Sequence, residues 1–485
     1  MSEVRTLEPK TVWNHFEDLN AVPRPSKKEE RVIAFMMDFG QQLGLETIKD
    51  DTGNVIIKKP ASDGFENRKT VILQAHLDMV HQKNADTEFD FDNEGIQSYI
   101  DGDWVKAKGT TLGADNGMGV AAIMALISSD NIPHPPLEAL FTIDEETGMT
   151  GAKGLTDQYL SGSILLNLDT EDDDELSIGC AGGVDTNTAY QCQLVDTPKD
   201  LVGYKIAVTG LKGGHSGMDI HLGRANANKV INRLIYNVQN QFTLSVNSID
   251  GGSLRNAIPR EAFATIAIRE GEEEGVLNVF EQLADEIKAE FSVTEPTMKI
   301  SIEKSDTPEK VISQEDQLKI TQSIQALHNG VYRMSATIEG LVETSSSLAR
   351  IELTDGKFST QSLQRSSVES AKIDIANTIG AAFKLQGANV EHTGDYPGWT
   401  PNPDSDILKI TESLYKKMFN DTPQIKACHA GLECGILSKA LPGVDMISFG
   451  PTIMHPHSPD EKVSISSVQK FWQYLLNVLE HIPKK

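Results

Sequence analysis

Three short apolar runs in the first 170 residues share one form and constrain the fold more than any other feature. They are TVILQAHLD (70–78), LEALFTIDEE (137–146) and SILLNLDTE (163–171). A continuous run of β-forming residues is typical of a strand that is buried on both faces, as in a parallel sheet. Between the first two runs, the small and apolar residues of NGMGVAAIMALISSD (116–130) predict a buried helix. A fourth apolar run, DMISFGP, begins at residue 445. This alternation predicts an α/β domain with a mainly parallel sheet.

The middle of the chain has a different pattern. YKIAVTGLKGG, REAFATIAIRE, MKISIEKS and LARIELTDGKFS read as alternating strands, separated by helical stretches such as Ala225–Gln239 and Gly275–Phe291. Alternation predicts a sheet with one face covered by helices and the other face free. We therefore predict an inserted α+β domain at 187–395, with residues 1–186 and 396–485 forming one discontinuous domain.

The bulk composition limits the class of protein. A chain of 485 residues is too long for one compact core, so two or three domains are expected. The net charge is 44 − 70 = −26, which disfavours binding to nucleic acid and to anionic membranes. The N-terminal stretch has no apolar segment typical of a signal peptide, and no run of about 18 apolar residues occurs. The four cysteines form no C-x-x-C pair, so we expect reduced thiols and a cytoplasmic protein.

Side chains that can bind metal ions follow the apolar runs. In open α/β sheets such side chains converge where the carboxyl ends of the strands meet. They are His76, Asp78, Glu145, Glu146 and Asp169, together with Asp115 in the glycine-rich loop TTLGADNGMG and His457 in GPTIMHPHSPDE. One His, one Asp and one Glu can bind a single ion, whereas two His with three carboxylates fit two ions that share a carboxylate. Mixed histidine and carboxylate ligands suit zinc, with cobalt or manganese as substitutes.

The neighbouring residues Glu145 and Glu146 are expected to have different roles, because successive side chains of a strand point to opposite faces. Several other motifs carry no function in this interpretation. GMGVAA (117–122) fits a dinucleotide fingerprint but follows a polar loop, and GHSGM (214–218) has methionine where a nucleophile elbow needs glycine. The acidic run TEDDDE (170–175) is expected to be a solvated turn.

Five segments resemble the metal-binding blocks of the co-catalytic zinc peptidases, the family of aminoacylases, carboxypeptidase G-type enzymes and bacterial dipeptidases. They are QAHLDMV, TTLGADNGMG, DEETGMTGA, LNLDTE and GPTIMHPHSPDE. The likeness extends through most of the chain, and LKGGHSGMDIHLGRANANK, GGSLRNAIPREAFATI and HAGLECGIL resemble most closely the aminoacyl-histidine (Xaa-His, carnosinase-like) dipeptidases within that family. All five blocks are intact, which disfavours a degenerate copy.

The resemblance implies two Zn²⁺ per subunit, with Co²⁺ or Mn²⁺ as substitutes. Asp115 would bridge both ions, His76 and Asp169 would complete one site, and Glu146 and His457 would complete the other. The pattern P-H-S-P selects His457 as the ligand over His455, which is two residues earlier.

The resemblance also assigns the proton chemistry. Glu145 would be the general base that takes a proton from a zinc-activated water and later delivers it to the leaving amine. Asp78, on the same strand face as His76, would accept the second ring N–H of that histidine. The family tends to have a cis peptide after the bridging aspartate, here between Asp115 and Asn116.

The inserted domain would act as a lid and a dimerisation domain. Asn256 and Arg365 are the candidates for binding the terminal carboxylate of the substrate, with Arg365 as the charged donor. His215 matches a residue that stabilises the oxyanion, often from a partner subunit, and Gly431 would offer a backbone N–H. A homodimer and a small dipeptide substrate are therefore expected.

The sequence as a whole predicts a cytosolic two-zinc dipeptidase, with substrates that include Xaa-His dipeptides such as carnosine. Within the same family, a tripeptidase, an N-acyl amino-acid deacylase or a carboxypeptidase would keep the same metal ligands and differ in the lid. A protein of another class, a non-catalytic binding or scaffold protein, would be expected to have lost a ligand or the base.

Overall fold

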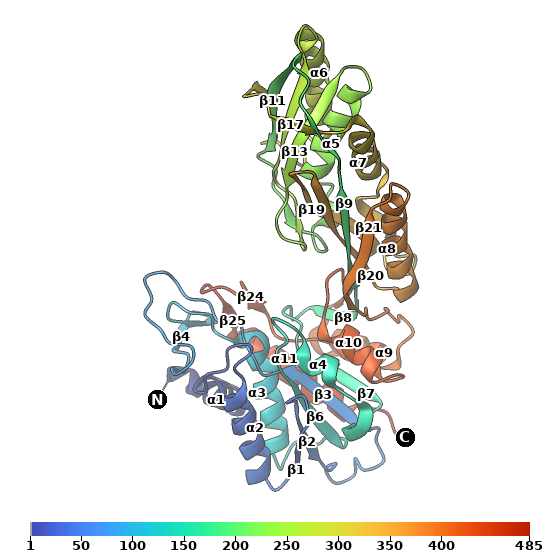
Figure 1. Ribbon diagram of the computed structural model, residues 1–485. Helices are drawn as coiled ribbons and strands as arrows, with labels where there is room; N and C mark the ends of the chain where they lie inside the picture. Colours follow the sequence, from blue (N-terminus) through green and yellow to red (C-terminus); the bar gives the residue numbers. More distant parts are fainter. Residues whose placement is uncertain (1) are drawn as a thin grey trace. The chain divides into compact units, whose positions relative to one another are not determined.

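The chain folds into two compact units, seen in a computed structural model that describes residues 2–485 (Figure 1). Unit 1 comprises the residues up to Gly179 together with Trp399–Ala427 and Leu432–Lys485. Unit 2 comprises Cys180–Gly398 and Cys428–Gly431. The predicted limits of the inserted domain, 187–395, and its role as a lid stay predictions.

Unit 1 contains an eight-stranded sheet with the order β1-β2-β6-β3-β7-β23-β8-β22 and a four-stranded sheet with the order β24-β25-β5-β4. The strands are β1 Glu46–Lys49, β2 Val55–Lys59, β3 Val71–His76, β4 Ser98–Asp101, β5 Trp104–Ala107, β6 Leu137–Thr142, β7 Ile164–Asn167, β8 Glu175–Cys180, β22 Gln424–Cys428, β23 Asp445–Ser448, β24 Ile453–Met454 and β25 Lys462–Ser464. The helices are α1 Lys10–Asn20, α2 Glu30–Gln42, α3 Ala114–Ser128, α4 Thr150–Gly154, α9 Asp406–Phe419, α10 Glu433–Ala440 and α11 Ile465–Glu480, with short 3₁₀ turns η1 Glu3–Thr6 and η2 Asp157–Tyr159.

The four apolar runs predicted from the sequence form the centre of the larger sheet. Strands β6, β3, β7 and β23 are parallel neighbours, and every residue of β3, β6 and β7 is buried. β1 pairs antiparallel with β2, β2 with β6, and β8 with β23, so the sheet is mixed and parallel in its centre. The predicted α/β fold is confirmed, and the parallel centre brings the carboxyl ends of four strands to one edge.

The predicted buried helix is α3, which is buried from Ala114 to Ile127. Its glycines allow close packing. A Cβ atom at Gly119 would lie 2.7 Å from the carbonyl oxygen of Leu168, in the segment that follows β7. The side chain of Asn116 donates to the same carbonyl at 2.7 Å. Gly119, in the segment that resembles a dinucleotide fingerprint, therefore allows this helix to pack against the sheet edge.

Unit 2 is built on a nine-stranded sheet in which neighbouring strands are antiparallel. Its strands are β9 Gly182–Gln191, β11 Leu201–Thr209, β13 Leu244–Gly251, β15 Ala262–Arg269, β16 Lys299–Lys304, β18 Gly330–Met334, β19 Val342–Thr354, β20 Lys357–Ser366 and β21 Asn389–Tyr396. Two small pairs are β10 Leu194–Asp196 with β17 Lys310–Ile312, and β12 Gly214–His215 with β14 Ala257–Ile258. The helices are α5 Ala227–Gln239, α6 Glu273–Glu290, α7 Gln314–Ala326 and α8 Glu369–Lys384, with the 3₁₀ turn η3 Ile220–Leu222.

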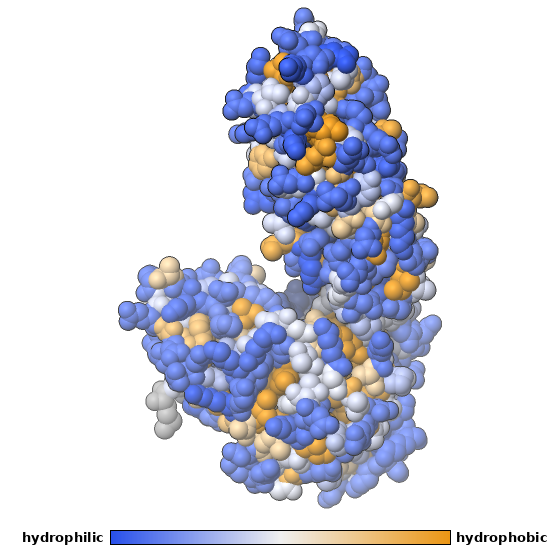
Figure 2. All heavy atoms as spheres, in the orientation of Figure 1, coloured by the Kyte–Doolittle hydropathy of each residue, from blue (hydrophilic) through white to orange (hydrophobic). Residues whose placement is uncertain are grey.

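The core of unit 2 lies between its sheet and its helices, because apolar side chains of α5, α6, α7 and α8 join those of the strands in one buried cluster. Outside this core, Phe263 on β15 is 45% exposed. Hydrophilic residues cover most of the face of the molecule in Figure 2, as the net charge leads one to expect. No helix within residues 2–485 combines the length and apolar character needed to span a membrane.

Candidate metal centre

The predicted ligands lie together at the carboxyl edge of the parallel strands of unit 1. His76 is the last residue of β3, while Glu146 and Asp169 follow β6 and β7 by a few residues. Asp115 lies in the first turn of α3, and its peptide bond to Asn116 is cis, as predicted. His457 follows β24 in a left-handed backbone conformation, with φ of 62°. The sheet topology thus brings five separate segments of the chain to one place.

The two carboxylate oxygens of Asp115 face two different sets of side chains. Oδ1 lies 3.2 Å from Nε2 of His76, which is itself 3.5 Å from Oδ1 of Asp169. Oδ2 lies 3.2 Å from Nε2 of His457, which is 2.9 Å from Oε2 of Glu146. Asp115 therefore stands between a His–Asp pair and a His–Glu pair.

Asp78 holds the main chain that carries the two neighbouring glutamates. Its Oδ1 accepts the backbone N–H of Glu145 at 3.0 Å, and its Oδ2 accepts that of Glu146 at 3.3 Å and the hydroxyl of Ser26 at 2.8 Å. Nδ1 of His76 lies 3.4 Å from Oδ1 of Asp78 and 3.1 Å from its carbonyl oxygen. Asp78 thus orients the ring of one predicted ligand and the backbone of another.

The pKa shifts of the side chains in this centre indicate an excess of negative charge, which a nearby positive charge would stabilise. Burial raises the pKa of the Glu145 carboxyl well above its usual range. Burial acts in the same direction on Asp115, but hydrogen bonds with His457 and His76 bring the pKa of Asp115 below its usual value. Hydrogen bonds to Asp115 and Glu146 raise the pKa of His457 to about 11. Protonated imidazole compensates the carboxylates in the protein alone, and a bound cation can take over this part.

The donor set fits a zinc site. His76, Asp115 and Glu146 offer ligand atoms that all lie within 4.8 Å of one another. Among residues 2–485, Oε1 of Glu146 and Oδ1 of Asp169 are buried without a hydrogen-bond partner. Buried carboxylate oxygens are normally paired or bound to a metal ion, so these atoms are suited to coordinate one. Imidazole nitrogen and carboxylate oxygen are ligands that zinc accepts.

A second acidic group lies beside the centre and differs from it. Glu29, Asp78 and Asp144 also offer oxygens within 4.8 Å of one another. Here the chain supplies its own cation, because the ammonium of Lys27 lies 3.5 Å from Oδ2 of Asp144. Asp144 also accepts hydrogen bonds from the hydroxyls of Thr147 and Thr150, so it shapes the turn after β6. Asp144 is the first of three consecutive acidic residues, and these contacts give it a structural role in the turn that differs from the roles expected for Glu145 and Glu146.

Buried polar side chains that precede the predicted ligands on the strands are linked by hydrogen bonds. Asn167 donates to Gln74, and Gln74 donates to Oε2 of Glu433 at 2.7 Å, which also accepts from Thr142 at 2.8 Å. Gln74 and Asn167 are paired across β3 and β7, each two residues before a predicted ligand. Burial raises the pKa of Glu433 to about 8. Sequence reasoning missed Glu433, which is in the segment HAGLECGIL but far from the strand ends along the chain.

The acidic run 170–175 was predicted to be a solvated turn, and this is wrong for Glu171. Burial, followed by the charges of Asp115 and Asp169, raises the pKa of Glu171 to about 8. Three other residues of the run have partners on distant segments: Asp173 pairs with Lys470, Asp174 binds Gln424, and Glu175 pairs with Lys426. Asp172 is exposed.

Two further buried charges support the loop that carries Asp115. The carboxylate of Glu461 is 2% exposed and accepts the backbone N–H groups of residues 112–115. Burial raises the pKa of Glu461 to about 7, against the opposing effect of these N–H donors. The guanidinium of Arg24 is 1% exposed and donates to the carbonyl oxygens of Leu77, Asp78 and Gly113. Glu461 is part of the motif GPTIMHPHSPDE, yet only the fold reveals its partners.

The predicted substrate-binding residues lie in unit 2. Nδ1 of His215 accepts the backbone N–H groups of Gly217 and Met218, at 3.2 and 3.0 Å. The neutral ring must therefore carry its hydrogen on Nε2, which makes Nε2 a donor. Burial, followed by the charge of Arg365, lowers the pKa of His215 and favours this neutral form. Asn256 is exposed, and its backbone carbonyl oxygen accepts the backbone N–H of Ser216 at 2.8 Å.

Arg365 is the centre of this group of residues. Arg365 is 4% exposed, its guanidinium donates to the hydroxyl of Tyr396 at 2.7 Å, and its Nε has no hydrogen-bond partner within residues 2–485. A Cβ atom at Gly217 would lie 3.1 Å from Nε of Arg365, and one at Gly431 would lie 2.9 Å from the ring of Tyr396. Close contacts therefore link Arg365 to the segments of His215 and Gly431.

His429 is adjacent to the same group. Nε2 of His429 lies 2.8 Å from the hydroxyl of Ser345, and a Cβ atom at Gly217 would lie 2.1 Å from the His429 carbonyl oxygen. Burial, followed by the charge of Arg365, lowers the pKa of His429 to about 3. We name Arg365, Tyr396, His429, His215 and Gly431 the Arg365 cluster.

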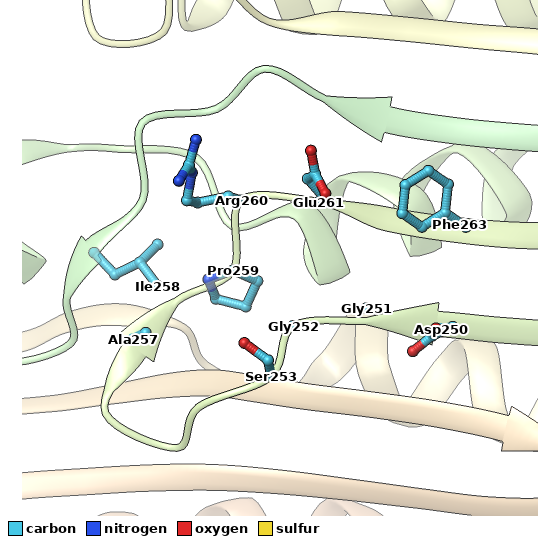
Figure 3. Close-up of a pocket in the computed structure, with 10 residues that line it drawn as sticks. All are labelled: Asp250, Gly251, Gly252, Ser253, Ala257, Ile258, Pro259, Arg260, Glu261 and Phe263. Atoms are coloured by element: carbon cyan, nitrogen blue, oxygen red, sulfur yellow. The ribbon is translucent and has the colours of Figure 1, made fainter. Parts of the chain in front are cut away.

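A separate pocket of about 340 Å³ lies in unit 2 between the end of β13 and the start of β15 (Figure 3). Asp250, Glu261, Arg260 and Phe263 are among its lining residues. None of the ten lining residues drawn in the figure is a predicted site residue. Asp250 also forms an ion pair with Arg350, so the charge there is compensated within the chain.

Comparison with known proteins defines the family. Residues 72–481 match the peptidase family M20/M25/M40, and the chain belongs to this family. The cytosol non-specific dipeptidase of Escherichia coli (strain K12) is 41% identical over 485 residues, which is the full length of both chains. The family resemblance predicted from the sequence is therefore confirmed.

Solved structures agree with this result. The aminoacylhistidine dipeptidase from Vibrio alginolyticus is 44% identical, and the match covers 100% of this chain and 99% of that one with a TM-score of 0.96. The aminopeptidase PepT from Bacillus cereus is 17% identical with a TM-score of 0.57, over 98% and 99% of the two chains, and shares the fold.

Proposed function

We propose that this protein is a cytoplasmic metal-dependent dipeptidase whose substrates include Xaa-His dipeptides such as carnosine. Support comes from its membership of peptidase family M20/M25/M40 and from its full-length similarity to two dipeptidases. One of these relatives is named a cytosol dipeptidase and the other an aminoacylhistidine dipeptidase.

The position of Asp115 is the observation that carries the proposed metal site. One of its oxygens faces His76 and the other faces His457, each at 3.2 Å. A carboxylate between two ligand pairs is suited to bridge two ions. We therefore assign His76 and Asp169 to one zinc ion, Glu146 and His457 to the other, and Asp115 to both.

Glu145 is the proposed general base. When bound, the zinc ions would polarise the scissile carbonyl and increase the acidity of water. Glu145 takes a proton from the attacking water and delivers it to the leaving amine. Burial raises the pKa of Glu145, and a carboxyl with a raised pKa is better suited to accept and then return a proton near neutral pH. Asp78 holds the backbone of Glu145 and fixes the orientation of the His76 ring.

The Arg365 cluster is the proposed recognition site for the dipeptide's terminal carboxylate. Arg365 would bind the carboxylate as a charged donor, assisted by Asn256 and the backbone N–H of Gly431. His215 would stabilise the oxyanion through its Nε2 hydrogen. Unit 2 would also mediate homodimer formation, which sedimentation analysis of the purified protein would test.

Hydrolysis assays with chelator-stripped protein test this function, with and without added zinc. The panel contains carnosine, Ala-His, Gly-Gly-His, N-acetyl-methionine and a folate-type glutamate conjugate. We expect zinc-dependent cleavage of the dipeptides alone. Cleavage of the tripeptide, the acyl amino acid or the glutamate conjugate instead would identify a tripeptidase, a deacylase or a carboxypeptidase. Absence of any cleavage with zinc fully bound would contradict an enzymatic function and favour a binding protein.

A further inference from the structure

One buried carboxylate accepts four consecutive backbone N–H groups beside the metal centre. Oε2 of Glu461 accepts the N–H groups of Leu112 and Gly113, at 2.7 and 3.0 Å. Oε1 accepts those of Ala114 and Asp115, at 2.7 and 3.2 Å. The side chain is 2% exposed, so both of its oxygens are used within the protein.

These four donors belong to the turn before α3 and to the first turn of that helix. The first N–H groups of a helix have no partner inside the helix, and a negative charge is stabilised there. Gly113, just before the helix, has φ of 69°, a left-handed conformation that glycine adopts without strain. The loop therefore closes around the carboxylate of Glu461 and depends on it for its conformation.

The hydrogen bond from the N–H of Asp115 connects the carboxylate of Glu461 to the proposed metal site. Glu461 is 346 residues away from Asp115 in sequence, but it follows His457 by four residues. A single side chain thus ties the segment of one proposed ligand to the backbone of the proposed bridging ligand. Within residues 2–485, no other side chain accepts a hydrogen bond from the backbone N–H of Asp115.

Arg24 completes this support from the other side of the loop. Its guanidinium donates to the carbonyl oxygen of Gly113 at 2.6 Å and to those of Leu77 and Asp78 at 3.1 and 3.2 Å. It therefore connects the loop to the end of β3, where His76 lies. The charge of Arg24 also acts on that of Glu461, so two buried charges of opposite sign hold the loop between them.

We propose that Glu461 is a positioning residue of the metal centre, an inference that rests on the proposed function. By holding the backbone of Asp115, it keeps one oxygen of that carboxylate towards His76 and the other towards His457. Partners that orient a metal ligand contribute to metal affinity, although they do not touch the ion. Loss of Glu461 should therefore weaken zinc binding itself and not only the stability of the fold.

Glu138 provides a matched control in the same unit. It is 4% exposed and likewise accepts backbone N–H groups, from Ser161 and Gly162 at 2.8 and 2.9 Å. It lies near the amino end of β6, whereas the predicted ligands follow the carboxyl ends of the strands. A substitution there removes a comparable buried carboxylate without touching the loop of Asp115.

The experiment compares Glu461→Gln and Glu138→Gln in the full chain. Glutamine keeps the size of the side chain but replaces one acceptor oxygen with an NH₂ group that faces N–H donors. Zinc affinity of the stripped proteins is measured by competition with a chromophoric chelator, and thermal unfolding is measured without metal. We expect Glu461→Gln to bind zinc about 10- to 100-fold more weakly than the wild type. Glu138→Gln should lose stability and keep wild-type zinc affinity.

Wild-type zinc affinity in Glu461→Gln, or an equal loss in both variants, would overturn the inference. If Glu461→Gln does not fold, Glu461→Asp takes its place, because it keeps the charge but shortens the reach. Weaker zinc binding by Glu461→Asp than by the wild type supports the positioning role, and an unchanged affinity contradicts it. Failure of the wild type to bind zinc or to cleave dipeptides would instead defeat the proposed function.

Discussion

The metal centre of unit 1 and the Arg365 cluster of unit 2 bury charges of opposite sign. Unit 1 gathers Asp115, Glu146 and Asp169 around two histidines, with carboxylate oxygens that have no hydrogen-bond partner in the described chain. Unit 2 buries the guanidinium of Arg365, whose Nε has no hydrogen-bond partner among the described residues. A buried charge is costly unless it is paired. The difference therefore predicts a cationic ligand for the first unit and an anionic ligand for the second.

Lys372 is an example of a buried charge that is paired with opposite charges of the same chain. Lys372 is fully buried and forms ion pairs with Glu369 and Asp395, at 3.0 and 2.6 Å. Such a group can be explained by the structure alone. The acidic centre and the Arg365 cluster differ from it, and this is the physical basis for assigning them to metal and substrate.

The largest expected effect follows from removing the charge that both metal-ligand pairs share. Asp115→Asn keeps the shape of the side chain and should lower the zinc content to less than one ion per chain. Dipeptide turnover should fall below detection, because neither of the two proposed zinc sites would keep the proposed bridging ligand. Elemental analysis after dialysis measures the metal content. Asp250→Asn, which alters an exposed ion pair with Arg350, is the control, and two zinc ions with full turnover in Asp115→Asn would refute the assignment.

A smaller effect is expected in the second unit. Arg365→Met removes the buried cation and should raise KM for dipeptides about 10- to 100-fold, since a hydrogen bond to a charged group contributes about 1.5–3 kcal/mol. Zinc content should stay at the wild-type value. Arg350→Met removes an arginine of the same sheet that is paired with Asp250 and Glu352, and KM should change little. Steady-state kinetics measure KM for both variants. An unchanged KM in Arg365→Met would contradict the expectation that unit 2 binds an anionic group of the substrate.

The smallest expected effect concerns pH. The pKa of His429 is about 3 in the folded protein and about 6.5 in an unfolded chain. Between these values the unfolded state binds a proton that the folded state does not. The free energy of unfolding should therefore fall as the pH falls, by about 2 kcal/mol at most between pH 7 and pH 5.

His429→Gln lacks this proton, so its urea-induced unfolding should depend less on pH than that of the wild type. Urea titrations of both proteins at pH 7 and pH 5 make the comparison. Identical pH dependence of the two proteins would show that burial beside Arg365 does not keep His429 neutral.

The centre of unit 1 could be predicted because sequence pattern and topology agree there. Continuous apolar runs predicted β3, β6, β7 and β23, and parallel strands bring their carboxyl ends together. The antiparallel strands β1, β2 and β8 at the sides of the sheet were not predicted. Their pairing depends on partners far along the chain, and no local pattern identifies such partners.

The same limit applies to the site. His76, Asp115, Glu146, Asp169 and His457 belong to segments with a recognisable pattern at the strand ends. Glu461, Arg24 and Glu433 were missed because their hydrogen bonds go to the main chain or to amide and hydroxyl groups of distant segments. For the acidic run 170–175, the local pattern led to a wrong prediction for Glu171. A row of charges suggests solvent, yet the fold turns Glu171 towards the centre.

The most direct test of the proposed centre is a zinc titration of metal-stripped Glu145→Gln, followed by an assay of dipeptide hydrolysis. We predict that two equivalents of zinc bind, as in the wild type, while kcat falls about 10²- to 10⁴-fold through loss of the general base. Glu146→Gln, the substitution one residue further on, should instead lose zinc. Full turnover in Glu145→Gln, or loss of its zinc, would contradict the division of roles between the two neighbouring glutamates.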